Sequence, residues 1–224
     1  MNKSVLAAIF IMMSGLGGVA QTAQQFSEES PAFGAVNIVV SNLESEGNAY
    51  FSDAELSERS GRYDEAITLF SKAAFEYNSS NQLSRYGLAL MRLSNVHYLM
   101  NHYVEAEQVV LNVALKNYAK MGSKMGQMES YGQLGRIYLA SEQLTQSLWF
   151  YTQQGILARQ LRNSGAHIES VLGIANVKIR KREYRMASDD LNQAEALARA
   201  ANNSRYATKI KQARALIQAN RSKS

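Results

Sequence analysis

Residues 60–77 read SGRYDEAITLFSKAAFEY, and the same pattern of residue types occurs three more times along the chain. Tyr63 and Phe70 lie three residues before and four after Ala66, so the three side chains share one helix face. The other segments read NHYVEAEQVVLNVA, EQLTQSLWFYTQQG and REYRMASDDLNQAE. Their aligned small residues are Ala66, Ala106, Ser147 and Ala187, separated by 40, 41 and 40 positions. The pattern predicts a repeated amphipathic helix that another helix can approach closely.

Each of these helices is expected to be the second of a pair. Twelve positions before the aligned small residue stand Ala54, Ser94, Gly135 and Ala175, which are all small. Sixteen positions before it stand the large residues Tyr50, Leu90, Tyr131 and Val171. Seven positions after it are Ala73, Val113, Gln154 and Ala194, again mostly small. Alternating large and small surfaces favour stacked helical hairpins, with Gly61 and Asn101 in turns that need a left-handed backbone.

Composition agrees with a helical repeat protein. The chain has 224 residues, a single proline and no cysteine. Proline interrupts helices, so its near absence indicates long unbroken ones. The lack of cysteine excludes disulfides, Cys-ligated zinc, iron–sulfur clusters and thiol catalysis.

Two segments resemble a known family, SGRYDEAITLFSKAAFEY at 60–77 and YGQLGRIYLASEQLTQSLWFY at 131–151. Both are similar to the tetratricopeptide repeat (TPR) pattern, with Leu134, Gly135 and Tyr138 at its first-helix positions. The period near 40 residues resembles a longer-helix subclass rather than the common 34-residue repeat. The resemblance implies an all-α fold, a right-handed α-solenoid of stacked antiparallel helix hairpins. Its four TPR-like repeats would span about 47–86, 87–127, 128–167 and 168–202.

The N-terminus has the features of a secretory signal peptide. Lys3 precedes an apolar run from Val5 to Met13, and small residues including Gly18 and Ala20 follow. We expect cleavage after Ala20, with an uncleaved anchor as the alternative. The run is shorter than the roughly 20 residues that span a bilayer, so we expect no transmembrane span in the mature chain. This predicts a periplasmic protein, or one secreted beyond the cell.

The remaining segments flank the repeats. Residues 21–46 are interpreted as a polar stretch followed by a flanking helix that begins near Ser30-Pro31. Residues 203–224 are interpreted as a capping helix with a frayed tail. Within it, Tyr206, Ile210, Ala213 and Ile217 form one apolar stripe.

No catalytic constellation stands out. The histidines are His97, His102 and His167, and none has the spacing of a metal-ligand cluster. No phosphate-binding, dinucleotide-binding or hydrolase motif occurs. We therefore expect no enzyme activity, no cofactor and no metal.

Charge divides the chain in two. Residues 21–76 carry ten acidic and three basic residues, whereas residues 77–224 carry nine acidic and twenty basic ones. A basic surface is predicted at Lys178, Lys181, Arg182 and Arg185. Besides a solvated surface, it suggests docking to an acidic partner or an anionic envelope surface, but not to nucleic acid. The opposite charges also permit self-association into a homo-oligomer.

The TPR resemblance implies that the first helices line a concave groove that binds a protein or peptide. The residues that match its inner positions are Met91, Asn95, Tyr98, Leu99, Arg136, Leu172, Asn176 and Arg180. Our first hypothesis is thus an exported, noncatalytic adaptor or scaffold. The alternative is a structural or assembly subunit that self-associates, or docks on an anionic surface, through its basic C-terminal half.

Overall fold

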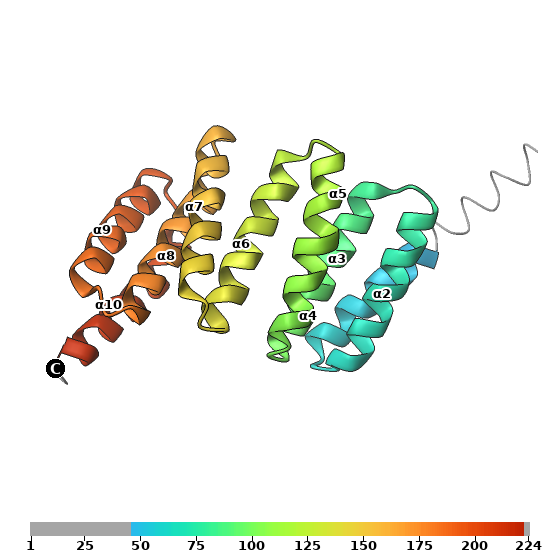
Figure 1. The fold of residues 1–224 in the computed structure, drawn as a ribbon, viewed down its shortest axis with the longest axis horizontal. Coiled ribbons are helices and arrows are strands. Elements are labelled where there is room, and N and C mark those ends of the chain that lie inside the picture. Colours follow the sequence, from blue (N-terminus) through green and yellow to red (C-terminus); the bar gives the residue numbers. More distant parts are fainter. Residues whose placement is uncertain (1–45, 222–224) are drawn as a thin grey trace, which may run out of the picture.

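A computed structural model describes residues 46–221, and every regular element in that range is a helix (Figure 1). Consecutive helices pack against each other in chain order, which confirms an all-α arrangement of the solenoid type. The first helix covers residues 46–59. The following elements are α2 (Tyr63–Ser79), α3 (Leu83–Leu99), α4 (Tyr103–Gln108), η1 (Val109–Ala114), α5 (Leu115–Lys120), α6 (Lys124–Ala140), α7 (Leu144–Gln160), α8 (Ser164–Arg180), α9 (Tyr184–Ala200), η2 (Ser204–Tyr206) and α10 (Ala207–Arg221).

Paired helices follow one another as hairpins: 46–59 with α2, α3 with α4-η1-α5, α6 with α7, and α8 with α9. Each second helix also packs against the first helix of the next hairpin, as α7 does against both α6 and α8. First helices further contact one another, as α6 does with α3 and with α8. The first helices α3, α6 and α8 start at Leu83, Lys124 and Ser164.

The positions predicted to be small are the places where helices touch. Ala66, Ala106, Ser147 and Ala187 are all completely buried. Where serine replaces alanine, its hydroxyl donates to a backbone carbonyl on the facing helix. Ser147 Oγ lies 2.8 Å from the Gly135 carbonyl oxygen, so the polar atom is satisfied inside the core.

The second hairpin contains a π-helix that explains the single spacing of 41. Helices α2, α3, α6, α7, α8 and α9 each have 17 residues. The continuous segment α4-η1-α5 runs from Tyr103 to Lys120 and is one residue longer. A π-turn accommodates one inserted residue within a helix. Consequently Val113, which aligns with Ala73 and Ala194 in sequence, is half-buried, and Ala114 occupies the completely buried position.

All turns between these long helices share one backbone conformation. Each contains one residue with positive φ, namely Gly61, Asn81, Asn101, Gly122, Glu142, Arg162, Arg182 or Asn202. At the first turn the Gly61 N–H donates to the Glu58 carbonyl and the Arg62 N–H donates to the Ser57 carbonyl. This is the Schellman motif, which ends a helix by satisfying its last carbonyl groups. The predicted left-handed turns at Gly61 and Asn101 are thereby confirmed.

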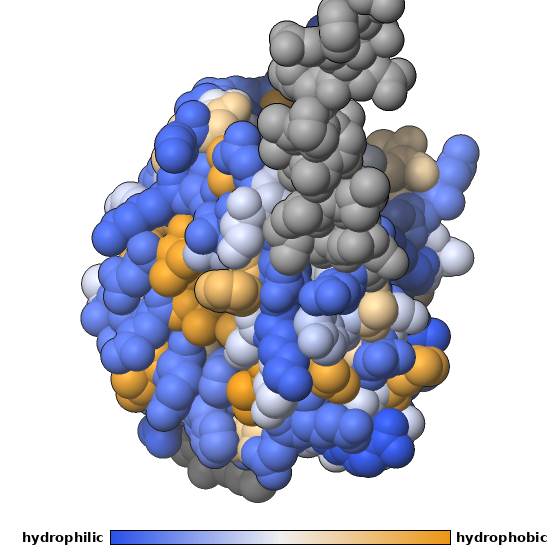
Figure 2. Space-filling view, turned by 90° about the vertical axis from the view of Figure 1, so that its right-hand side faces the viewer, coloured by the Kyte–Doolittle hydropathy of each residue, from blue (hydrophilic) through white to orange (hydrophobic). Residues whose placement is uncertain are grey.

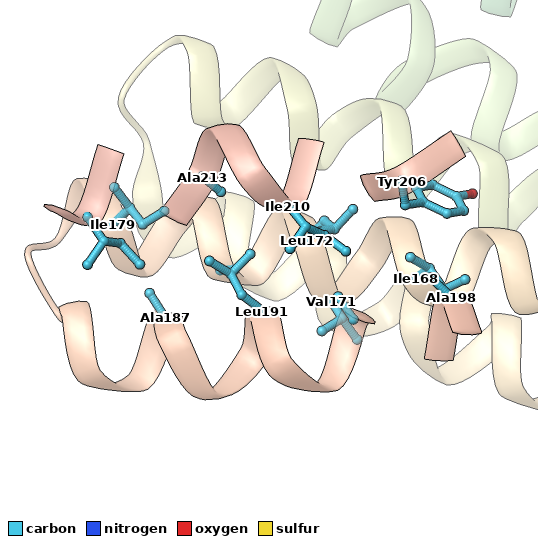
Figure 3. Close-up of a cluster of buried hydrophobic side chains, with 13 residues drawn as sticks. Ile168, Val171, Leu172, Ile179, Ala187, Leu191, Ala198, Tyr206, Ile210 and Ala213 are labelled. Carbon is cyan, nitrogen blue, oxygen red and sulfur yellow. The ribbon is translucent and has the colours of Figure 1, made fainter. Parts of the chain in front are cut away.

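At the C-terminal end, η2 and α10 cover α8 and α9 (Figure 3). Tyr206, Ile210, Ala213 and Ile217 are buried, which confirms the predicted apolar stripe. Figure 3 shows Tyr206 beside Ile168 and Ile210 beside Leu172. The Tyr206 hydroxyl lies 3.1 Å from the Gly165 carbonyl oxygen and thus joins η2 to the start of α8.

At the opposite end, the first hairpin displays hydrophobic groups interspersed among hydrophilic ones (Figure 2). Leu56 and Phe75 are its exposed large hydrophobic side chains. The predicted signal peptide (1–20), the segment 21–45 and the last three residues lie outside the described residues. Within 46–221, no helix combines the length and apolar character needed to cross a bilayer.

Candidate functional site

A groove of about 820 Å³ lies across the first helices of three successive hairpins. Its walls come from α3, α6 and α8, and Arg205 and Lys209 extend it to η2 and α10. Two residues of the second helix α7, Tyr151 and Gln154, also line it. The groove is therefore built by the stacking of hairpins rather than within any one of them.

Most of the predicted groove residues lie together in this groove. Those that line it are Met91, Tyr98, Arg136, Leu172, Asn176 and Arg180. Asn95 and Leu99 do not line it. Leu99 is the last residue of α3, with 43% of its surface exposed, and Asn95 contacts the groove indirectly through Arg136.

Arg136 is held firmly in the groove wall. Its guanidinium donates to Asn95 Oδ1 at 3.1 Å and to Gln133 Oε1. It also lies over the ring of Tyr98, with 5.1 Å between the guanidinium carbon and the ring centroid. These contacts join α3 to α6 and fix the orientation of a cation that a ligand can meet.

From Asn95 the polar contacts continue to the first hairpin. The Asn95 amide donates to Glu58 Oε1 at 2.8 Å. Arg92 bridges the carboxylates of Glu58 and Glu55 at 2.7 and 3.2 Å. Glu55 and Glu58 of the first hairpin thus share one cation of α3.

Sequence reasoning missed the floor of the groove. Tyr151 is buried in the closely packed space between α6 and α8. A Cβ atom added at Gly135 or Gly173 would approach its ring within 2.8 and 2.5 Å, respectively. Gln154 is also buried and lies over Gly132. One feature of the sequence could have identified Gln154. It is the large polar residue at the aligned position where the other repeats have Ala73, Val113 and Ala194.

The groove has an excess of positive charge. Its cationic side chains belong to Arg136, Arg180, Arg205 and Lys209, and its carboxylates belong to Glu129 and Glu169. Arg205 pairs with Glu169, and Arg180 pairs with Glu142 just outside the lining. Burial raises the pKa of the Tyr151 hydroxyl despite the opposing influence of Arg136, so this group is neutral at physiological pH. Burial also raises the pKa of Glu129.

Two of the four residues of the predicted basic surface form ion pairs. Lys178 lies 2.7 Å from Asp190, and both side chains are only 17% exposed. Lys181 pairs with Glu183 at 2.7 Å. Arg182 occupies the turn position with positive φ, and Arg185 is exposed at the start of α9.

The histidines lie apart from the groove lining. The rings of His97 and His102 are 6.1 Å apart at the turn between α3 and α4. Burial lowers the pKa of His97, and the neighbouring His102 lowers it further while Glu105 opposes the shift. Among residues 46–221 no three His, Cys, Asp or Glu side chains are placed to hold a metal ion.

The chain matches no protein-family model, and no curated protein matches it.

Proposed function

We propose that this chain is an exported, noncatalytic adaptor of the TPR type, with four repeats in a right-handed solenoid, which binds a protein or peptide segment in its groove. The observation that carries the proposal is the groove itself: three successive first helices line it, and six residues expected from the repeat pattern face it. Ordered polar and apolar side chains on one continuous surface suit the recognition of a peptide.

The ion pairs favour the groove over the basic C-terminal surface as the binding site. Lys178 and Lys181 form ion pairs with Asp190 and Glu183, respectively. Arg136, by contrast, faces the groove with an orientation fixed by neighbouring side chains. A fixed cation loses little conformational entropy when it binds a ligand.

Affinity capture from envelope extract tests the adaptor function. The bait is the full chain, compared with a variant carrying Asn95→Ala, Arg136→Ala and Asn176→Ala. The matched control carries Asn112→Ala, Arg159→Ala and Asn192→Ala, which removes the same residue types from exposed positions of second helices. We expect the partner to be lost by the groove variant and kept by the control, with cooperative unfolding in both.

Equal capture by all three baits would contradict groove binding. If capture then fell steeply with added salt, it would instead support docking through the basic half. N-terminal sequencing of the protein recovered from the periplasm tests export separately. A mature chain that begins at Gln21 is expected.

A further inference from the structure

In the third hairpin a large and a small side chain have exchanged places. In the other hairpins the second helix supplies a completely buried alanine, Ala73, Ala114 or Ala194. The first helices place Phe51, Met91 or Leu172 in the same clusters as these alanines. In the third hairpin the second helix supplies Gln154, and the first helix supplies Gly132.

Because of this exchange, the side-chain amide of Gln154 occupies the space that a large first-helix side chain fills in the other hairpins. A Cβ atom added at Gly132 would lie 2.4 Å from Gln154 Nε2 and 2.8 Å from its Cδ. No side chain larger than hydrogen therefore fits at position 132 while Gln154 keeps this conformation. Gln154, like Tyr151 of the same second helix, thereby lines the groove.

Gln154 is left with an unused hydrogen-bonding atom. Only 5% of its surface is exposed, and its Oε1 has no hydrogen-bond partner among the described residues. A buried acceptor without a donor is unfavourable, because the hydrogen bond it made to water is not replaced. A ligand that supplies an N–H group at this point would remove that cost.

The chemistry of the amide identifies the ligand. A glutamine side chain presents one acceptor and two donors, which complements the N–H and C=O groups of a peptide main chain. In a helix these main-chain groups are already paired with each other, so only an extended segment offers them. Arg180 pairs with Glu142 and Arg205 pairs with Glu169, so Arg136 and Lys209 are the groove cations that favour an acidic segment.

We propose that Gln154 binds the main chain of an extended, acidic peptide segment, positioned over Gly132 in the groove. This inference deepens the proposed adaptor function and rests on it. Gln154 and Gly132 act as a pair, because the amide reaches the ligand only where residue 132 has no side chain.

The test uses peptides selected from a random 12-residue display library on the wild-type chain. Affinities of the selected synthetic peptides are measured for wild type and for Gln154→Met, which keeps a side chain of similar length without the amide. A second variant, Gly132→Leu with Gln154→Ala, gives the third hairpin the same pair of residue types that Leu172 and Ala194 form in the fourth. We expect this swapped variant to fold with stability at least equal to wild type. Both variants should weaken peptide binding roughly tenfold or more.

N-methylation of each peptide bond in turn locates the main-chain contact. One position should lose about tenfold in affinity for wild type and nothing further for Gln154→Met, since that variant lacks the partner. Selected peptides should also be enriched in Asp and Glu. Undiminished binding by Gln154→Met, an absence of any sensitive N–H, or selected peptides without acidic residues would overturn the inference.

The inference and the adaptor function fail in different ways. Peptides that bind Gln154→Met normally, but not the Asn95, Arg136 and Asn176 variant, would refute the role of Gln154 and leave groove binding intact. If the library yields no peptide and capture from extract is unaffected by the groove variant, both proposals are overturned.

Discussion

Single glycines decide how closely the hairpins approach. Tyr118 of α5 lies between Gly87 of α3 and Gly126 of α6, and a Cβ atom on either glycine would fall within 2.6 and 2.2 Å of its side chain, respectively. Burial raises the pKa of Tyr118 to about 12, with a further contribution from Glu129. The neutral Tyr118 ring therefore fits between α3 and α6 only because both facing residues are glycines.

We predict that Gly126→Ala destabilises the chain by about 1–3 kcal/mol, because the methyl group overlaps the Tyr118 ring. The measurement is urea unfolding followed by circular dichroism. Gly165→Ala is the control. Its Cβ would meet the ends of the Arg205, Tyr206 and Asn163 side chains at 3.3, 3.4 and 3.5 Å, so its stability should stay near wild type. An equal loss of stability in both variants would contradict the close packing of Tyr118 against Gly126.

The partly buried histidines make stability depend on pH. Burial lowers the pKa of both His97 and His167 relative to the unfolded chain, so below about pH 6.5 the unfolded chain binds more protons. We therefore expect the free energy of unfolding to fall as the pH is lowered from 7 to 5.5. Replacing both residues with glutamine should flatten this dependence in denaturant titrations at each pH. If the free energy of unfolding of the double variant depends on pH as strongly as that of wild type, the two histidines are not the cause.

Among the elements, the second helix of the second hairpin is exceptional because it carries an inserted residue. Its π-helix, Val109–Ala114, places Ala114 in the buried position that a 17-residue helix would give to residue 113. Asn112 is exposed within the π-helix. The insertion thus preserves the core on both sides of it.

Deleting Asn112 should convert α4-η1-α5 into a regular helix, with stability within about 1 kcal/mol of wild type. Deleting Gln153 from α7 is the matched control. A missing residue in a regular helix rotates everything after it by roughly 100°. It would turn Gln154 and Ala158 out of the core, at a cost above about 3 kcal/mol. Thermal melts of the two deletions distinguish these outcomes. Similar losses would show that the π-helix is not a removable insertion.

Across the whole molecule, contacts link neighbouring hairpins, so a defect at one end should stay local. Ile210 of α10 is 3% exposed and belongs to the cluster that joins α8, α9 and α10. We expect Ile210→Asp to reduce hydrogen-exchange protection in α8, α9 and α10 but not in α3. Leu216→Asp, on the exposed face of the same helix, should change neither region. Loss of protection throughout the chain would indicate a single cooperative unit instead.

The aligned residues alone determined the helical hairpins and the buried strip of small residues. Spacing along the chain specifies them, because the helix period and the need to bury apolar surface are local properties. Ala66 and Ala106 show this directly, since both were identified by spacing and both are completely buried. Six residues of the groove wall were expected from the TPR resemblance, which assigns the inner positions of the first helices.

Three contacts are visible only in the tertiary structure. Gln154 lies over Gly132, Arg136 donates to Asn95, and Lys178 forms an ion pair with Asp190. The tertiary structure also moved the buried position from Val113 to Ala114. These features depend on how one helix is rotated and spaced against another. Residues 12 to 41 positions apart in sequence are brought together only by the packing of whole helices, whose relative rotation no local pattern encodes.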